Sequence, residues 1–483
     1  MKFRYNIKSI SNNIFKKIVR NIGYNIDRIS DLELKINKII LIKDRVKKYS
    51  EVKAIAKKYP KDPRVQLFLA ETMYDNWDAN YFDQINIYAN SRMNLLKANG
   101  LDEINMEFIN PGVVEGSLGN YWPLEGLIHA NEYKLRPVKN IYLLCREYFK
   151  PRNKTLFEYF VPYLRVIRDK EIISSLQRLE PLLTLPVGMC LPFGKKGVDF
   201  EWIPNLVQQE RIKLNKYERH TTLKLTDEHY EKGKRILKKI GLPGNAWYIT
   251  LHVREPGYRD ETKYNTNSKI RNANPLNYVK SIKAVTEAGG WVFRMGNPEG
   301  NSTKLPPMPN VIDYAHSSIR SEFMDVFLGA TCKFCIGTSS GYFCIPRYFS
   351  IPVILTNTPR TTEYFPLTKK DFFLPKIFLN EKTRKYIKFD ESMTPPMSFS
   401  GVDEQYSSRS IKFIENQPDE LEGVTKEMLE RITIKSNNND TESNIQKEFK
   451  KISEKSFNEK TGGSLKSFAS IGRHFIERYS DLM

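Results

Sequence analysis

Short apolar runs alternate with amphipathic stretches through the second half of the chain. The predicted strands occupy residues 247–253, 291–295, 311–314, 334–336 and 353–355. The predicted helices between them occupy residues 274–287, 318–330 and 341–349. Strands that alternate with helices in this way favour a parallel sheet with crossover helices. The pattern therefore predicts an α/β fold for this half.

An earlier stretch repeats the same alternation on a smaller scale. Residues 106–110 and 139–145 have the composition of strands, and residues 122–133 have that of a helix. A glycine-bearing loop at residues 111–120 separates the first strand from the helix. Strand, glycine loop, helix and strand together make a βαβ unit. Residues 155–235 show no comparably clear pattern until a capped helix near their end.

The first hundred residues carry helical periodicity. Residues 1–50 are predicted as a basic amphipathic helical segment, with apolar positions that recur at helical spacing at Ile14, Phe15, Ile18, Val19 and Ile22. Residues 51–100 are predicted as a helical hairpin broken at residues 59–63, where the sequence resembles a tetratricopeptide-type join. One copy of that join is too few to indicate a repeat array.

The rest of the chain divides into four segments. Residues 101–240 are predicted as a first α/β domain and residues 241–435 as a second. Residues 436–463 are rich in Lys, Glu, Ser and Asn, which predicts a polar linker. Residues 464–483 are predicted to close the chain with a helix that docks back on the body.

Positive charge is concentrated near the N-terminus of the chain. The chain has 483 residues and a formal net charge of +20, and residues 1–60 contain 16 Lys and Arg against 5 Asp and Glu. A basic amphipathic helix can lie on an anionic membrane surface, or it can pack on its own protein and expose a solvated basic face. Nucleic acid is not expected as a partner, because zinc-finger spacing and RNA-binding aromatic motifs are missing.

Targeting and metal-binding signals are also missing from the sequence. No apolar run approaches ~18 residues, and the first residues lack a signal-peptide pattern. We therefore expect a cytoplasmic protein, peripheral on the inner face of the membrane if residues 1–60 bind lipid. Cys332 and Cys335 are interpreted as buried strand cysteines. The six histidines are scattered and no Asp-x-Asp occurs, so no metal site is predicted.

Arginines follow the predicted strands of the second half. Arg254 comes directly after the first of these strands, and Arg259 and Arg271 lie in the loop beyond it. Arg294 ends the next strand, and Gly296 follows closely. The carboxyl ends of parallel strands share one edge of a sheet, and guanidinium groups bind phosphate through paired charge-assisted hydrogen bonds. These arginines predict an anionic ligand such as a diphosphate; the alternative is that each forms a surface ion pair.

The loop Gly337-Thr-Ser-Ser-Gly341 is a second candidate anion site. Free amide groups at a helix N-terminus can bind an anion, with hydroxyl donors from Ser339 and Ser340 and small residues such as Gly341 that allow close approach. The alternative is a tight strand-to-helix turn in which a serine caps the helix. The loop is neither a Walker loop nor a dinucleotide-binding glycine motif. His252 is interpreted as a structural histidine.

In order along the chain, these residues resemble a family of bacterial glycosyltransferases associated with surface polysaccharide or glycoprotein assembly. The resemblance covers roughly residues 100–380 and a closing motif. The motifs are His252-Val-Arg-Glu255, Gly257-Tyr-Arg259, Ile270-Arg-Asn-Ala-Asn274, Tyr278, Gly290-Trp-Val-Phe-Arg-Met-Gly296, Asp313-Tyr-Ala315, Asp325, Gly337-Thr-Ser-Ser-Gly341 and Ile471-Gly-Arg-His-Phe-Ile-Glu-Arg-Tyr479. The pair His252-x-Arg254 is also similar to the first motif of α-1,2-fucosyltransferases, although the second Arg and the Asp of that motif do not follow.

The resemblance implies a GT-B architecture, in which two Rossmann-like domains face a cleft. The second domain would hold a nucleotide-sugar donor, and the first would hold a glycan, glycolipid or protein acceptor. No cofactor and no metal are implied. The residues implied around the donor are Arg254, Arg259, Arg271, Asn274, Arg294, Gly296, Ser339, Ser340 and Gly341.

An inverting transfer also needs a base that takes the proton of the acceptor hydroxyl. Glu115, in the glycine loop of the first domain, is the first candidate, and Glu255 is the second. A function of another class is a non-catalytic scaffold, in which a degenerate transferase fold recruits a partner through the N-terminal helices. Nucleotide binding discriminates between these two functions.

Overall fold

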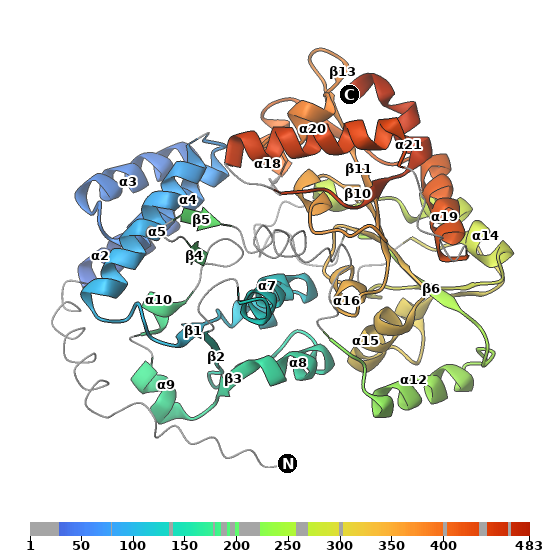
Figure 1. Ribbon diagram of the computed structural model, residues 1–483, viewed down its shortest axis with the longest axis horizontal. Helices are drawn as coiled ribbons and strands as arrows, with labels where there is room; N and C mark the ends of the chain where they lie inside the picture. The colour runs from blue at the N-terminus through green and yellow to red at the C-terminus, as the bar shows by residue number, and fades with distance from the viewer. Residues whose placement is uncertain are drawn as a thin grey trace. The chain divides into compact units, whose positions relative to one another are not determined.

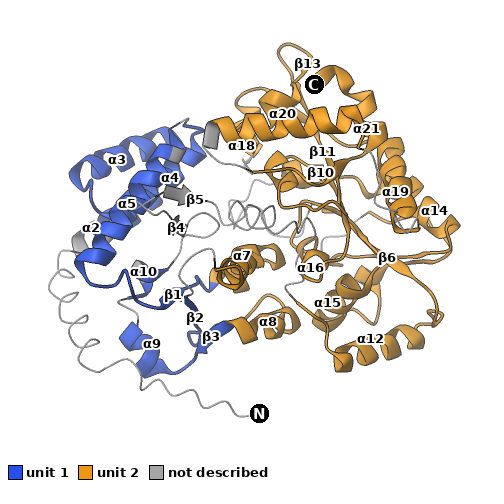
Figure 2. Cartoon of the chain, viewed as in Figure 1, with its two compact units in different colours: residues 1–111, 136–149, 164–202 blue, residues 112–135, 150–163, 203–483 orange. Residues whose placement is uncertain are grey.

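The computed structural model divides the chain into two compact units (Figures 1 and 2). The structure describes residues 29–78, 80–134, 139–176, 179–184, 191–193, 199–201, 223–256, 269–298, 303–398, 403–433, 442–461 and 465–483. Unit 1 comprises residues 1–111, 136–149 and 164–202, and unit 2 comprises residues 112–135, 150–163 and 203–483. The amphipathic helix predicted around residues 14–22 lies outside the described residues.

Unit 1 contains a helical block followed by a small sheet. The helices are α2(Ile29–Ile40), α3(Arg45–Lys58), α4(Pro63–Asp75) and α5(Tyr81–Ala98). The carboxylate of Asp62 accepts a hydrogen bond from the backbone N–H of Arg64, and Pro63 occupies the first turn of α4. The predicted break at residues 59–63 is therefore confirmed, and a further break separates α4 from α5. Leu32, Ala56 and Val65 form a buried core in this block.

The small sheet confirms the parallel strands of the predicted βαβ unit. Strand β1(Met106–Phe108) pairs with β2(Asn140–Leu144), and β2 pairs with β3(Leu164–Ile167), both in parallel. Strand β3 lies where the sequence pattern was unclear. Unit 1 also includes α9(Lys170–Leu176), α10(Glu180–Leu183) and the antiparallel pair β4(Leu191–Phe193) and β5(Asp199–Glu201).

Unit 2 is built on a seven-stranded sheet of order β15-β11-β10-β9-β6-β7-β8. Its strands are β6(Tyr248–His252), β7(Trp291–Arg294), β8(Val311–Ile312), β9(Cys335–Thr338), β10(Val353–Thr358), β11(Phe372–Pro375) and β15(Ser470–Ile471). Every pairing described in this sheet is parallel. The predicted α/β fold with a parallel sheet is therefore confirmed, because each predicted strand of this half overlaps a strand of the sheet.

Helices of unit 2 come from three separate stretches of the chain. Residues 112–135 contribute α6(Gly112–Glu115), η2(Leu118–Tyr121) and α7(Trp122–Glu132), and residues 150–163 contribute α8(Lys154–Phe160) and η3(Val161–Tyr163). The remainder contributes α12(Asp227–Lys239), α14(Val279–Glu287), α15(Glu322–Thr331), α16(Cys344–Tyr348), α17(Phe389–Ser392), α18(Asp403–Ser407) and α19(Pro418–Thr433). A smaller sheet joins β12(Ile377–Asn380) to β13(Lys385–Tyr386) and β14(Ile411–Ile414). Across the described residues, no helix is both long and apolar enough to cross a membrane.

The C-terminal region differs from the predicted polar linker. Residues 444–461 form helix α20(Asn444–Thr461), and the chain then adds β15 to the sheet before α21(Arg473–Arg478) and η8(Ser480–Leu482). Phe449 and Phe457 are buried on one face of α20 and contact Tyr364 and Phe365, respectively. The linker prediction is wrong here because two aromatic residues eight positions apart anchor a helix that is otherwise polar. The predicted C-terminal helix is confirmed in shorter form by α21.

Candidate anion-binding site

The carboxyl ends of β6, β9 and β10 lie side by side at one edge of the large sheet. Thr338 is the last residue of β9, and its hydroxyl accepts a hydrogen bond of 2.9 Å from the backbone N–H of Arg254. This bond fixes the residues that follow β6 against the end of β9. Arg254 therefore stands at the strand end, where the sequence pattern placed it.

Arg254, Arg271 and Arg360 form a cluster at this edge. Arg271 ends η4(Lys269–Arg271), and Arg360 lies in the loop after β10. The pKa of Arg271 is lowered to about 9, mainly by burial and then by the like charges of Arg360 and Arg254. Its buried Nε atom has no hydrogen-bond partner among the described residues. Opposed positive charges and an unsatisfied buried donor are the features expected of an anion site.

Arg360 is a residue that the sequence-based prediction missed. Its guanidinium group donates to Ser339 Oγ at 3.1 Å and pairs with Glu363 of η7(Thr361–Tyr364). Glu363 also accepts hydrogen bonds from the hydroxyls of Ser339, at 2.8 Å, and Thr358, at 2.9 Å. One carboxylate thus holds Arg360 and joins the loops after β9 and β10. Arg254 was selected because it follows a predicted strand, and we call this criterion the strand-end rule. Arg360 follows β10 in the same way, so the same criterion would have selected it.

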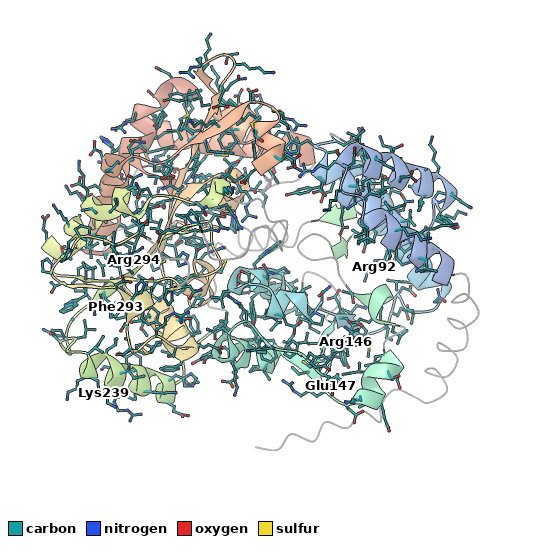
Figure 3. The ribbon with its side chains drawn as sticks, turned by 180° about the vertical axis from the view of Figure 1, so that it is seen from behind. Arg92, Arg146, Glu147, Lys239, Phe293 and Arg294 are labelled. Carbon is teal, nitrogen blue, oxygen red and sulfur yellow. The ribbon has the colours of Figure 1, made fainter. Side chains whose placement is uncertain are left out.

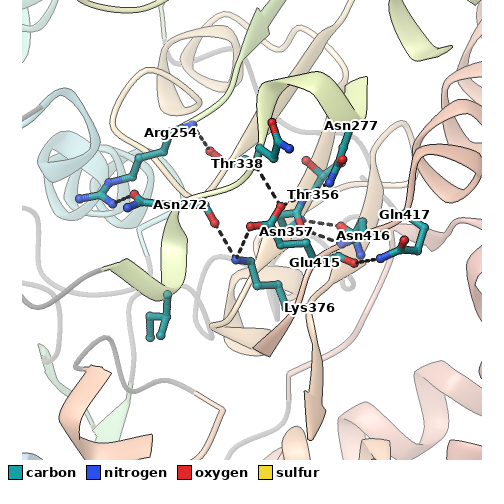
Figure 4. A network of polar contacts seen from close by, with 12 residues as sticks. Arg254, Asn272, Asn277, Thr338, Thr356, Asn357, Lys376, Glu415, Asn416 and Gln417 are labelled. Atoms are coloured by element: carbon teal, nitrogen blue, oxygen red, sulfur yellow. Dashed lines mark hydrogen bonds and ion pairs between the residues drawn. The ribbon is translucent and has the colours of Figure 1, made fainter. Parts of the chain in front are cut away.

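Lys376 adds a fourth cation beside the cluster and was also missed (Figure 4). Its ammonium group donates to the backbone oxygen of Asn272 at 2.6 Å, and the side chain of Asn272 accepts from Arg254. Burial lowers the pKa of Lys376 to about 8, although Glu415 lies 4.0 Å away. Asn272 therefore connects two cations through different oxygen atoms.

A buried polar network joins the end of β10 to Tyr278 and Asn416; Asn357 and Asn416 of this network are labelled in Figure 4. The hydroxyls of Tyr278 and Thr356 share a hydrogen bond of 2.7 Å, and the side-chain amide of Asn357 donates to Tyr278 at 2.9 Å. Asn357 and Asn416 exchange two further bonds, of 2.7 and 2.8 Å. A fully bonded buried network fixes a single arrangement of the segments that it joins. The loops that carry Arg271 and Arg360 therefore start from a rigid base.

The loop at residues 339–341 differs from its predicted role. Helix α16 begins only at Cys344 and has 5 residues, so no long helix starts at Gly341. The hydroxyl of Ser339 is bonded to Glu363, and that of Ser340 lies 3.0 Å from Nδ1 of His252. The helix predicted at residues 341–349 is therefore confirmed in shorter form, with its first residue at Cys344, and both hydroxyls already have protein partners. The pKa of His252 falls to about 4, mainly through burial, so this histidine is neutral at pH 7.

Gly341 instead contacts the glycine loop that lies between β1 and α7 in sequence. A Cβ atom added at Gly341 would lie 2.7 Å from Ser117 Oγ and 3.2 Å from Gly119 N. A Cβ atom added at Gly119 would lie 3.3 Å from the Cα atom of Gly341. The two loops were predicted independently, and the structure brings their backbones into contact within unit 2.

We expect Gly341→Ala to lower the stability of unit 2 by about 1–3 kcal/mol, because the new methyl group overpacks this contact. Gly244→Ala is the matched control, since a Cβ atom there would meet nothing within 4 Å. Thermal unfolding of both variants measures the difference. Equal melting temperatures for Gly341→Ala and the parent protein would show that the two loops do not touch in solution.

Glu255 and Arg294 form a buried ion pair rather than parts of an open site. Oε2 of Glu255 accepts from Arg294 at 2.7 Å, and Oε1 accepts from the backbone N–H of Thr303 at 3.0 Å. Their side chains are 2% and 3% exposed. Figure 3 shows Arg294 beside Phe293 on β7. Burial and pairing leave Glu255 unsuited to take a proton from an acceptor, so the geometry argues against its predicted role. Arg294 keeps one buried nitrogen, Nη1, without a hydrogen-bond partner among the described residues, but its charge is already balanced by Glu255.

Three other residues were predicted to surround the nucleotide-sugar donor, and they differ in what the structure shows of them. The side chain of Asn274 accepts from the backbone N–H of Leu276 at 3.0 Å and caps η5(Pro275–Tyr278), which is a structural role. Gly296, two residues after β7, has φ of +153°, a conformation that favours glycine. Arg259 lies outside the described residues. None of these positions adds a described contact to the arginine cluster.

Glu115 is half-buried at the end of α6, within the glycine loop at residues 111–120, and the later part of this loop contacts Gly341. Its Oε1 atom accepts a hydrogen bond of 2.9 Å from the backbone N–H of Lys150. Glu115 and the arginine cluster both belong to unit 2. Of the two predicted bases, Glu115 is therefore the one that keeps part of its carboxylate exposed.

The remaining candidate residues are the possible metal ligands and the cysteines of the described part of the chain. The described residues contain no group of three or more His, Cys, Asp or Glu that could hold a metal ion. Cys332 and Cys335 are buried free thiols, as predicted, but only Cys335 lies in a strand, because Cys332 directly follows helix α15. Burial raises the pKa of Cys332 to about 12, which keeps this thiol protonated and unreactive.

Comparisons with known proteins complete this description. No family model matches the sequence, and no curated protein matches it. The structure is similar to one described as ADP-heptose lps heptosyltransferase II of E. coli, with 10% identity, a TM-score of 0.37, and coverage of 68% of this chain and 99% of that one. It is also similar to a glycosyl transferase family 9 structure from Veillonella parvula, with 9% identity, a TM-score of 0.31, and coverage of 52% and 81%. Both TM-scores are below 0.5, so a functional assignment rests on the chain's own residues.

Proposed function

We propose that this protein is a glycosyltransferase that uses a nucleoside-diphosphate sugar as donor. The observation that carries the proposal is the cluster of Arg254, Arg271 and Arg360 at the carboxyl edge of a parallel sheet. Ligands of open α/β sheets bind at this edge, and a diphosphate would neutralise the opposed charges of the cluster. The ordered motifs of the second half, which resemble those of bacterial glycosyltransferases, support the same donor class.

The proposed reaction is a displacement at the anomeric carbon of the donor sugar. The oxygen of an acceptor hydroxyl bonds to this carbon while the bond from the carbon to the diphosphate oxygen breaks. The departing electron pair adds negative charge to the diphosphate, and the arginine cluster stabilises that charge. The proton of the acceptor hydroxyl passes to Glu115. The acceptor in this proposal is a cell-surface glycan, free or linked to a lipid or protein.

Nucleotide binding is the first test of this proposal. A nucleoside diphosphate from the set UDP, GDP, dTDP, ADP and CDP is expected to raise the melting temperature, because it binds only the folded state. Arg254→Ala is expected to remove this shift, whereas Arg235→Ala, an exposed arginine on α12, is expected to keep it. Melting temperatures with and without nucleotide measure the effect. The absence of a shift with every nucleotide would rule out the donor site.

Turnover separates a transferase from a nucleotide-binding scaffold. The parent protein is expected to hydrolyse its nucleotide sugar slowly in the absence of acceptor. Glu115→Gln is expected to lose transfer while it keeps the thermal shift with nucleotide. A protein that binds nucleotide but turns over none of the common nucleotide sugars would be a scaffold of degenerate transferase fold.

A further inference from the structure

Exposed aliphatic side chains gather around the turn between α2 and α3, far in sequence from the arginine cluster. Leu41 and Val46 are 79% and 78% exposed, and Leu34 and Ile40 are 57% and 49% exposed. Large apolar side chains at this exposure are individually ordinary, but Ile40, Leu41 and Val46 flank one short turn and together form a candidate contact surface. We name Ile40, Leu41 and Val46 the apolar turn.

The core of the helical block does not use these side chains. Leu32 and Ile39 of α2 are buried, and Leu32 shares a core cluster with Ala56 and Val65. The apolar turn therefore remains outside the core, and its side chains can contact another surface without disturbing the fold. That distinguishes it from a poorly packed face of the same helices.

Lysines surround the apolar turn. Lys35, Lys38, Lys43 and Lys47 are all exposed. Residues 34–48 contain six Lys or Arg, and Asp44 is their one acidic residue. The carboxylate of Asp44 accepts a hydrogen bond from the backbone N–H of Lys47 and caps α3. Burial raises the pKa of the Asp75 carboxyl group on α4, and Arg45 and Lys48 lie close enough to oppose this rise. The four exposed lysines therefore supply the positive surface around the apolar turn.

We propose that the apolar turn and its lysines bind an anionic lipid surface. Aliphatic side chains can enter the boundary between headgroups and acyl chains while lysines pair with anionic headgroups. An acidic protein partner is less well matched, because protein interfaces favour aromatic and arginine anchors over lysine. The proposal goes beyond the donor site and does not depend on it.

Vesicle binding by the full chain tests this proposal. Co-sedimentation compares vesicles of phosphatidylcholine alone with vesicles of equal parts phosphatidylcholine and phosphatidylglycerol. The parent protein is expected to bind only the anionic vesicles, and added salt is expected to weaken binding. Lys43→Gln/Lys47→Gln is expected to weaken binding by roughly 10–30-fold, from about 1 kcal/mol per lysine. Leu41→Ser/Val46→Ser is expected to weaken binding by at least about tenfold.

Matched controls lie in unit 2. Lys238→Gln/Lys239→Gln removes two exposed lysines at the end of α12, and Leu276→Ser/Tyr386→Ser removes two side chains that are 46% and 47% exposed. Both control variants are expected to bind anionic vesicles like the parent protein. The proposal is overturned if the turn variants also bind like the parent, or if the parent does not distinguish the two vesicle types. All variants should keep the thermal shift with nucleotide, which separates this outcome from failure of the donor site.

Discussion

Replacing Glu255 by alanine is expected to lower the free energy of unfolding of unit 2 by about 3–5 kcal/mol. The substitution leaves Arg294 with its charge in a buried position, where its side chain is 3% exposed. Asp313 compensates only in part, because it lies 3.8 Å from Arg294 and is 43% exposed. The backbone N–H of Thr303 also loses its acceptor. An unpaired buried charge costs far more than the pair contributes, so this effect exceeds the other stability changes expected here.

Urea unfolding of Glu255→Ala beside Asp313→Ala measures this expectation. The second variant removes the exposed partner of the same arginine and is expected to cost less than about 1 kcal/mol. The double variant Glu255→Leu/Arg294→Met removes both buried charges and should recover most of the lost stability. If Glu255→Ala instead keeps full stability and loses only turnover, Glu255 acts as a catalytic base after all and the ion pair is not the resting state.

Replacing Arg271 by methionine is expected to weaken the binding of a nucleoside diphosphate by about 100-fold, while the stability of the free protein stays equal or rises. The first effect follows from the loss of charge-assisted hydrogen bonds to phosphate, each worth about 1.5–3 kcal/mol. The second follows because the free protein no longer buries a guanidinium group opposed by Arg254 and Arg360. Methionine fills a similar volume without the charge.

The opposite signs of the two effects are the diagnostic result. A residue that serves the fold should cost stability when it is replaced, whereas a residue held in place for a ligand should not. Isothermal titration measures the affinity, and thermal unfolding without nucleotide measures the stability. Arg235→Met controls for the loss of one positive charge and is expected to change neither quantity. A large loss of stability in Arg271→Met without nucleotide would assign Arg271 to the fold instead.

The fold could be predicted well where local pattern and tertiary role agree. Strands β6, β7, β9 and β10 are apolar runs buried in a parallel sheet. Their apolar composition alone therefore predicts that they are buried strands. Strand β15 has only two residues and pairs with β11, about a hundred residues earlier in the chain. No local pattern specifies such a pairing. Helix α20 was missed because Phe449 and Phe457 supply its buried anchors within a polar sequence.

The sequence predicted where the candidate site lies, at the carboxyl edge of the sheet, but it predicted only some of the residues that form the site. The strand-end rule identified Arg254 and Arg271, which the structure places in one cluster. The same rule also selected Arg294, whose buried side chain pairs with Glu255. Position along a strand does not determine whether a side chain finds a buried partner. That depends on residues that converge only in three dimensions, as Glu363 and Arg360 do.

Each unit is assembled from separate stretches of the sequence, and this affects which truncated fragments can fold and when unit 2 can fold during synthesis. Residues 112–135 and 150–163 belong to unit 2, although they are synthesised before most of its sheet. Gly119 packs against Gly341, and Asn153 donates a hydrogen bond to the backbone of Glu322 at 2.9 Å, so these early segments need partners roughly two hundred residues later. A fragment that starts at residue 241 would lack them and would expose the surfaces that they cover. On the ribosome, the early segments must wait for those partners, so we expect these segments to remain unpacked until Gly341 has emerged.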